Sequence, residues 1–237
     1  RMDSTSNAIT TLERVDLTGA TGTNAVDLAG NTNAVTVNLG TGADTVILSG
    51  AADDVNLSSS ASVDTLEYTE NTSTSVIASI SNFAFASGGD IAQVDLTDFE
   101  TANAVITGTI DMVDGNAVSI AAQTPTIKEI TTDTTIAAGD DLLVFVGTTF
   151  ADTDAAETAI ETGAYEIITP TAIAHDDAIL MFYSDGTDGY LAALIGAAAT
   201  PTANLASGET TVKNLLKFEG VSSISSGDLS AGDIVLS

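Results

Sequence analysis

A short phrase repeats along residues 15–76 and constrains the fold more than any other feature of the 237-residue chain. Each copy places an apolar residue on both sides of one central residue, and turns rich in Gly, Asn and Asp separate the copies. Side chains alternate between the two faces of a strand, so each copy predicts a short strand. Short strands at a step of 9 to 11 residues predict a coiled stack of strands, a β-solenoid. The copies are Val15-Asp16-Leu17, Val26-Asp27-Leu28, Val37-Asn38-Leu39, Val46-Ile47-Leu48, Val55-Asn56-Leu57 and Leu66-Glu67-Tyr68.

The charge of the chain limits its partners. It carries 33 acidic and 5 basic residues, so its formal net charge is −28. Such a chain should be repelled by nucleic acid and by anionic membrane surfaces, and it should attract cations, Ca²⁺ above all. The alternative is an acidic, solvated surface without a bound metal. No apolar run reaches the ~18 residues of a membrane span, which predicts no membrane insertion.

The turns between the copies contain a recognisable motif. Residues 40–46, Gly-Thr-Gly-Ala-Asp-Thr-Val, match the pattern G-x-G-x-D-x-aliphatic, and decayed copies begin at Gly19, Gly30 and Gly50. A second phrase, residues 80–99, contains an I-x-x-F followed by a Gly-Gly turn and alternating apolar residues. Together the two stretches resemble the RTX repeat of bacterial proteins secreted by the type I pathway.

The resemblance implies a parallel β-roll whose turns bind Ca²⁺. The glycines would supply positive-φ turns, and the Asp side chains would supply carboxylate oxygens. Residues 80–99 would form the strands that close the open end of the roll. The alternative is a solenoid whose turns are held by Asn and Thr hydrogen bonds without metal. The candidate metal ligands are Asn24, Asn33, Asp44, Asp53, Asp54, Asp64 and Asp90.

The second half of the chain has a different pattern of apolar and polar residues, and we place a domain boundary between residues 1–121 and 122–237. The continuous apolar run 142–146 predicts a central strand, and residues 154–161 predict one short helix capped by Asp152 or Thr153. Residues 178–195 predict a hairpin around an acidic turn. This half also resembles the terminal region of acidic extracellular RTX-type proteins, which implies an export or assembly domain. A small β domain that caps the solenoid is the alternative.

Catalytic motifs are weak, and we expect no enzymatic activity. The single histidine, His175, is interpreted as a loop residue. The chain has no cysteine and no histidine cluster for zinc. Acidic pairs such as Asp140-Asp141 are common in turns, and a polysaccharide lyase would need basic residues, of which none lies between Arg14 and Lys128.

These observations predict a mainly β protein, a parallel β-roll or solenoid followed by a β-rich C-terminal domain with one short helix. The predicted function is a non-enzymatic, secreted, extracellular protein that self-assembles on a bacterial cell surface as an S-layer or filament. The predicted cofactor is Ca²⁺, and the predicted partners are further copies of the chain, with a cell-surface polysaccharide as a further candidate. The alternative is a Ca²⁺-dependent adhesin or the C-terminal export module of a larger secreted enzyme.

Overall fold

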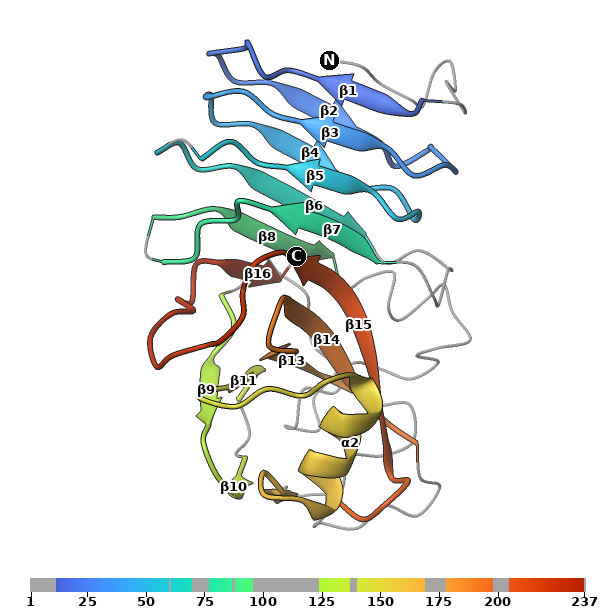
Figure 1. Ribbon diagram of the computed structural model, residues 1–237, viewed down its shortest axis with the longest axis vertical. Helices are drawn as coiled ribbons and strands as arrows, with labels where there is room; N and C mark the ends of the chain where they lie inside the picture. Colours follow the sequence, from blue (N-terminus) through green and yellow to red (C-terminus); the bar gives the residue numbers. More distant parts are fainter. Residues whose placement is uncertain are drawn as a thin grey trace.

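The first half of the chain forms short parallel strands that alternate between two sheets (Figure 1). The computed structural model describes residues 12–59, 61–69, 77–86, 88–95, 124–136, 140–168, 178–197 and 205–236. One sheet, called here the larger sheet, contains β1 (Arg14–Asp16), β3 (Thr36–Asn38), β5 (Asp54–Asn56) and β7 (Ala78–Ser81). The smaller sheet contains β2 (Ala25–Asp27), β4 (Thr45–Ile47), β6 (Thr65–Thr69) and β8 (Ile91–Asp95). These eight strands are called the strand stack.

The register of the strand stack follows the repeat. In the smaller sheet, Val26 pairs with Val46 and Val46 with Leu66, so one step along this sheet spans 20 residues (46 − 26 and 66 − 46). In the larger sheet, Val15, Val37, Val55 and Ile80 lie opposite one another in the same way. The chain is therefore mainly β with large parallel sheets, as the sequence predicts.

The second half of the chain extends both sheets. The larger sheet continues from β7 through β15 (Thr210–Phe218), β14 (Gly189–Gly196), β13 (Ala178–Ser184) and β11 (Leu142–Phe145) to β9 (Ile127–Ile130). The smaller sheet gains β16 (Ile234–Leu236), which pairs in parallel with β8. The strands β7 and β8 were expected to close an open end, but they hold interior positions. The expected boundary at residues 121 and 122 lies outside the described residues.

Several local predictions for the second half are confirmed. Helix α2 (Thr153–Thr162) begins after Asp152, whose side chain accepts a hydrogen bond from the Ala155 amide at 2.8 Å, and it ends at Gly163. β13 and β14 form the predicted antiparallel hairpin. β11 is buried along its whole length and lies between β9 and β13. A small two-stranded sheet joins β10 (Thr134–Thr135) to β12 (Ile167–Ile168).

Helix α2 covers part of one edge of β15 with carboxylates. Glu161 accepts hydrogen bonds from the Thr210 amide at 2.8 Å and the Gly208 amide at 2.9 Å, and Glu157 accepts one from the Val212 amide at 2.6 Å. β15 pairs with β7 only at Leu216–Phe218, so the amides nearer its start lie beyond that pairing. The two glutamates therefore provide acceptors for an edge that would otherwise present unpaired donors.

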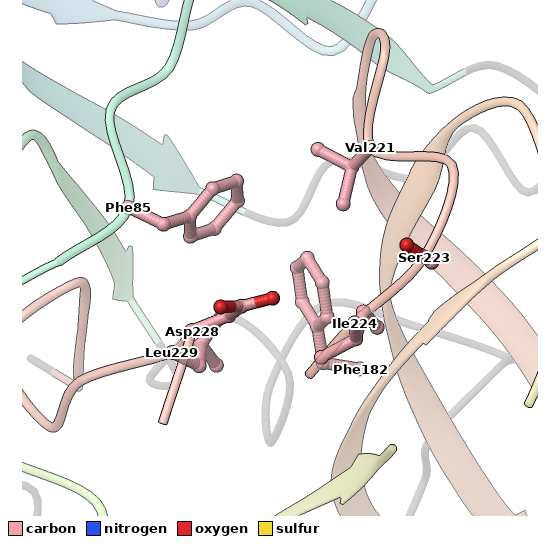
Figure 2. A pocket seen from close by; sticks show the side chains of 7 residues that line it. All are labelled: Phe85, Phe182, Val221, Ser223, Ile224, Asp228 and Leu229. Atoms are coloured by element: carbon pink, nitrogen blue, oxygen red, sulfur yellow. The ribbon is translucent and has the colours of Figure 1, made fainter. Parts of the chain in front are cut away.

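A long loop without regular structure connects β15 to β16. It lies beside Phe85, which follows β7, and Phe182 of β13, where the strand stack meets the second half (Figure 2). Hydrogen bonds fix the loop at several points, among them one from the Gly147 amide to the Ile224 carbonyl at 2.9 Å. The sequence predicts this Ser-rich stretch as a loop, and the structure confirms it.

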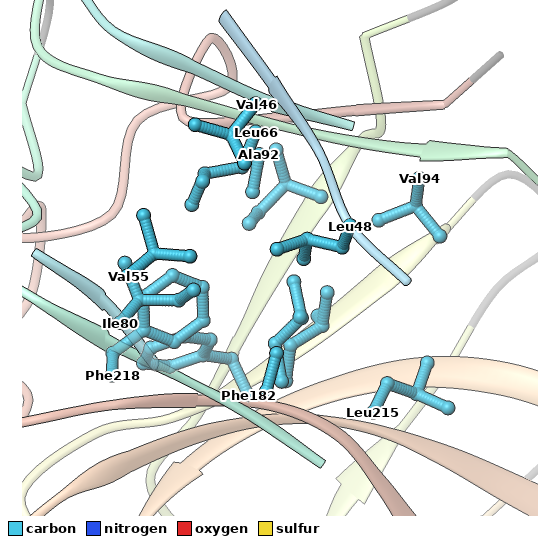
Figure 3. Packing of buried hydrophobic residues seen from close by; sticks show 14 of the residues in the cluster. Val46, Leu48, Val55, Leu66, Ile80, Ala92, Val94, Phe182, Leu215 and Phe218 are labelled. Atoms are coloured by element: carbon cyan, nitrogen blue, oxygen red, sulfur yellow. The ribbon is translucent and has the colours of Figure 1, made fainter. Parts of the chain in front are cut away.

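The core runs continuously from the strand stack into the second half (Figure 3). The apolar columns of the repeat, with Val37, Val46, Val55, Leu66 and Ile80 each fully buried, fill the space between the two sheets. Four phenylalanine rings continue this core at the junction, with centroids 4.6–5.5 Å apart for the contacting pairs. A second apolar cluster lies between α2 and the other face of the larger sheet and includes Phe145 and Ile160.

The sequence also indicates a first strand near residues 8–10 and a hairpin or coil turn over residues 105–120. These two stretches and His175 lie outside the described residues. Within the described part of the chain, no helix is long and apolar enough to cross a membrane.

Candidate functional site

A column of polar residues precedes the strands of the smaller sheet. Asn24, Asp44, Asp64 and Asp90 stand directly before β2, β4, β6 and β8, one residue ahead of each strand. The strands pair in register, so the four residues lie one above the other along the edge of the sheet. We call this column the aspartate ladder. The structure therefore brings together four of the seven predicted metal ligands.

Each carboxylate of the aspartate ladder accepts a backbone hydrogen bond from the preceding ladder residue. The Asn24 amide donates to Asp44 Oδ1 at 2.7 Å, the Asp44 amide to Asp64 Oδ1 at 2.8 Å, and the Asp64 amide to Asp90 Oδ1 at 2.8 Å. At the start of the ladder, the side-chain Nδ2 of Asn24 also donates to Asp44 Oδ1 at 2.8 Å. The side chains thus hold neighbouring turns together.

Two oxygens of the ladder remain without a partner. Asp44 and Asp64 are only 1% and 0% exposed, yet the Oδ2 atom of each makes no hydrogen bond. In contrast, Asp90 Oδ2 accepts a hydrogen bond from the Ala84 amide at 2.8 Å. A buried polar atom without a hydrogen-bond partner destabilises the folded chain. Binding of a proton or a cation is therefore most favourable at these two oxygens of the ladder.

Burial also changes the acid–base behaviour of the ladder. Desolvation, together with the neighbouring carboxylates of Asp90 and Asp44, raises the pKa of Asp64 from 3.8 to about 6, against the opposing Asp44 amide hydrogen bond. Desolvation and the charge of Asp233 likewise raise the pKa of Asp90. The ladder therefore concentrates negative charge that the fold disfavours.

Asp53 plays the equivalent part in the larger sheet. It stands before β5 and accepts a hydrogen bond on Oδ1 from the Val35 amide at 3.0 Å. Its Oδ2 accepts hydrogen bonds from the amide and the hydroxyl of Ser49 at 2.7 and 2.8 Å. Burial raises the pKa of Asp53, while these hydrogen bonds oppose the change. Both of its oxygens are used by the protein.

The structure places two of the predicted ligands elsewhere. Asp54 is the first residue of β5 and lies exposed on the sheet surface, next to Asp53 but outside the ladder. Asn33 is exposed in the turn before β3, and the position equivalent to Asp53 is held by Val35. Asn33 therefore does not join the aspartate ladder, because the turn before β3 places two further residues between Asn33 and the strand.

Asp233 is a polar site residue that sequence reasoning missed. It precedes β16 and accepts hydrogen bonds from the Ser230 amide at 2.6 Å and the Ala86 amide at 3.3 Å. It continues the column of buried carboxylates beyond Asp90, although β16 is shifted so that Ile234 pairs with Ala92. A signal was present, since the tripeptide Gly-Asp-Ile occurs at both 89–91 and 232–234.

The glycines of the motif serve close stacking of the turns. A Cβ at Gly40 would lie 2.0 Å from the Ala20 carbonyl oxygen, and a Cβ at Gly42 would lie 2.2 Å from the Gly22 carbonyl oxygen. Neither residue has the positive φ that the sequence suggested. The G-x-G spacing is thus required because one turn packs directly on the backbone of the turn before it.

The chemistry of the ladder fits a cation only in part. Within the described ranges, no group of three or more His, Cys, Asp or Glu side chains is arranged to hold a metal. Asp53 and Asp90 use both oxygens on protein donors, whereas Asp44 and Asp64 each retain one. Because Ca²⁺ takes six to eight oxygen ligands, these two carboxylates would need carbonyl groups and water to complete a site.

Comparison with known proteins adds no relative. No family model matches the chain, and neither a curated protein nor a solved structure matches it significantly. The function therefore has to be argued from the geometry of this chain.

Proposed function

We propose that the chain is a non-enzymatic extracellular structural protein that self-assembles on a bacterial surface, as an S-layer or a filament. In this proposal the strand stack is a β-roll of the RTX type, and the second half is an export and assembly domain. The protein would be secreted by the type I pathway. Additional copies of the same chain would be its principal partner.

The arrangement of the two sheet ends carries the proposal. Among the described strands, β1 ends the larger sheet and β2 ends the smaller sheet, both at the same end of the strand stack (Figure 1). The Thr45 amide donates to the Asn24 carbonyl and the Leu28 amide to the Ile47 carbonyl, each at 2.9 Å. Backbone groups alternate in direction along a strand, so the amides of Ala25 and Asp27 point away from the stack.

The same reasoning applies to β1. The Leu17 amide donates to the Asn38 carbonyl at 2.7 Å, and the Thr36 amide donates to the Glu13 carbonyl at 3.0 Å. The amides of Arg14 and Asp16 therefore point away from β3. Edges of this kind pair readily with another strand. The opposite ends of the two sheets, β9 and β16, differ from β1 and β2, so contacts between unlike ends would build a filament rather than a closed dimer.

In this proposal the aspartate ladder binds Ca²⁺. Ca²⁺ bound by Asp44 Oδ2 or Asp64 Oδ2 would neutralise buried charge and satisfy an oxygen that lacks a donor. The high negative charge of the chain would favour binding of a divalent cation. Bound Ca²⁺ would also reduce repulsion between copies that approach end to end.

A proline at Ala25 tests the assembly surface. Ala25→Pro removes an amide that points away from β4, so the strand stack should keep its fold while pairing at this edge is blocked. The control is Ala52→Pro, because Ala52 lies in an exposed turn away from both sheet ends. Sedimentation velocity should show assembly for the wild type and the control but not for Ala25→Pro, with similar melting temperatures. Equal assembly of all three proteins would contradict the proposal. A wild-type chain that stays monomeric in Ca²⁺ would favour the adhesin or export-module alternative.

A further inference from the structure

The loop between β15 and β16 lines a partly open cavity with a distinct chemistry. Its volume is about 150 Å³, and it lies where the strand stack meets the second half. A cavity of about this size accommodates a ligand similar to benzene. Most of its wall is apolar, and the polar side chains at its solvent side are Ser223 and Asp228, both exposed. The remaining lining residues are Phe85, Phe182, Val221, Ile224 and Leu229.

Two aromatic rings and one carboxylate face the cavity together. Figure 2 shows the Asp228 carboxylate directed into the space beside the rings of Phe85 and Phe182. The two ring centroids are 5.5 Å apart with an interplanar angle of 72°, so the edge of one ring meets the face of the other. A ring face attracts a cation through its quadrupole, and a carboxylate adds a full negative charge. An uncharged apolar ligand would use the walls but not the carboxylate.

The position of the carboxylate is fixed before any ligand arrives. Asp228 Oδ2 accepts a hydrogen bond from the Ser225 amide at 2.7 Å. The adjoining Gly227 amide donates to Glu129 Oε1 of β9 at 2.8 Å, and the Val221 carbonyl accepts a hydrogen bond from Ser184 Oγ at 2.8 Å. The loop is thus held on both sides of the cavity. A preformed site loses less conformational entropy when a ligand binds.

From this geometry we infer that the cavity binds a small organic cation of the alkylammonium class. The methyl or methylene groups of the ligand pack against Val221, Ile224 and Leu229. The positive charge lies against the Phe85 and Phe182 rings and is neutralised by Asp228. This role does not require self-assembly, because all the residues that line the cavity belong to one copy of the chain.

Isothermal titration calorimetry on the full chain can test the inference with defined probes. Tetramethylammonium and n-butylammonium represent quaternary and primary ammonium ligands, and tert-butanol is an uncharged probe of similar size. Sodium chloride at the same ionic strength replaces the ligand in the blank titration. We expect saturable binding of at least one ammonium ion and much weaker binding of tert-butanol. Preference between the two ammonium ions identifies the ligand subclass.

Three variants assign the binding to the cavity. Asp228→Asn keeps an oxygen for the Ser225 amide but removes the charge, and should weaken ammonium binding about fivefold. Glu13→Gln removes the same charge from an exposed position beside β1 and should leave the affinity unchanged. Phe85→Leu keeps an apolar wall but removes one ring, and should weaken ammonium binding about threefold without affecting tert-butanol. Melting temperatures confirm that each variant is folded.

Three results would overturn the inference: tert-butanol binding as tightly as the ammonium ions, equal effects of Asp228→Asn and Glu13→Gln, or no saturable binding of either ammonium ion.

Discussion

Asparagine in place of Asp64 should stabilise the folded protein at neutral pH. Asp64 is fully buried, and its Oδ2 has no hydrogen-bond donor. The introduced asparagine would keep Oδ1 as the acceptor of the Asp44 amide, which donates at 2.8 Å in the native chain. Its Nδ2 would be placed to donate to Asp90 Oδ1, as the Nδ2 of Asn24 donates to Asp44 Oδ1 at the start of the ladder. The substitution therefore removes a buried charge without removing the ladder.

The magnitude follows from the pKa of Asp64. Its value is raised from 3.8 to about 6 in the folded chain. The folded chain therefore binds this proton more tightly than the unfolded chain does. Protonation of Asp64 stabilises the folded chain fully below pH ~4, and this contribution is lost as pH rises through about 6. The full difference corresponds to about 3 kcal/mol. The asparagine still buries a polar group, so the expected gain for Asp64→Asn at pH 7.5 is smaller, about 1–2 kcal/mol.

Urea unfolding followed by circular dichroism between pH 4 and pH 7.5 measures this gain. The experiment is done in excess chelator, so that a metal does not compensate the charge. The difference in unfolding free energy between Asp64→Asn and the wild type should grow as pH rises. Asp54→Asn is the control, because Asp54 is exposed on β5 and its substitution should change stability by less than about 0.5 kcal/mol. A variant less stable than the wild type at pH 7.5, or a difference independent of pH, would refute the reasoning.

Three further outcomes are expected. Gly42→Ala should destabilise the fold by about 1–3 kcal/mol in urea unfolding, because the new Cβ would meet the Gly22 carbonyl oxygen at 2.2 Å; Gly22→Ala, which meets nothing within 4 Å, should cost far less. Glu161→Ala should lower the free energy of unfolding by about 2–4 kcal/mol in the same assay, because it leaves the Thr210 and Gly208 amides without their acceptor. Glu161→Gln should lower it less, and Glu13→Ala should have almost no effect. Ca²⁺ should raise the melting temperature of the wild type in differential scanning calorimetry, because a ligand that binds only the folded state stabilises it. Excess chelator should reverse the increase, and an unchanged melting temperature would remove Ca²⁺ from the proposal.

The apolar columns of the strand stack could be predicted because they are a local property of the sequence. Val26, Val46 and Leu66 each follow a turn at nearly the same step, and burial between two sheets requires this alternation. The grouping of Asp44, Asp64 and Asp90 could be predicted for the same reason. Their role as acceptors for the backbone of the adjacent turn could not, since a motif gives the residue type but not the direction of its side chain.

Other features depend on contacts between distant parts of the chain. Asp233 lies beside the ladder only because β16 returns across more than 100 residues to pair with β8. Asn33 lies outside the ladder because the turn before β3 has a different length, which moves Val35 into the equivalent position. The cavity beside Phe85 and Phe182 combines β13 with two loops, and no local pattern predicts such a site.

Electron microscopy of the purified full chain, with Ca²⁺ and with excess chelator, tests the central claim most directly. If the exposed edges of β1 and β2 drive assembly and Ca²⁺ neutralises the charge between copies, sheets or filaments should form with Ca²⁺ and disperse in chelator. The Ala25→Pro chain should form neither under any condition. Single, separate particles of the wild type in both buffers would contradict the account of this chain as a self-assembling structural protein.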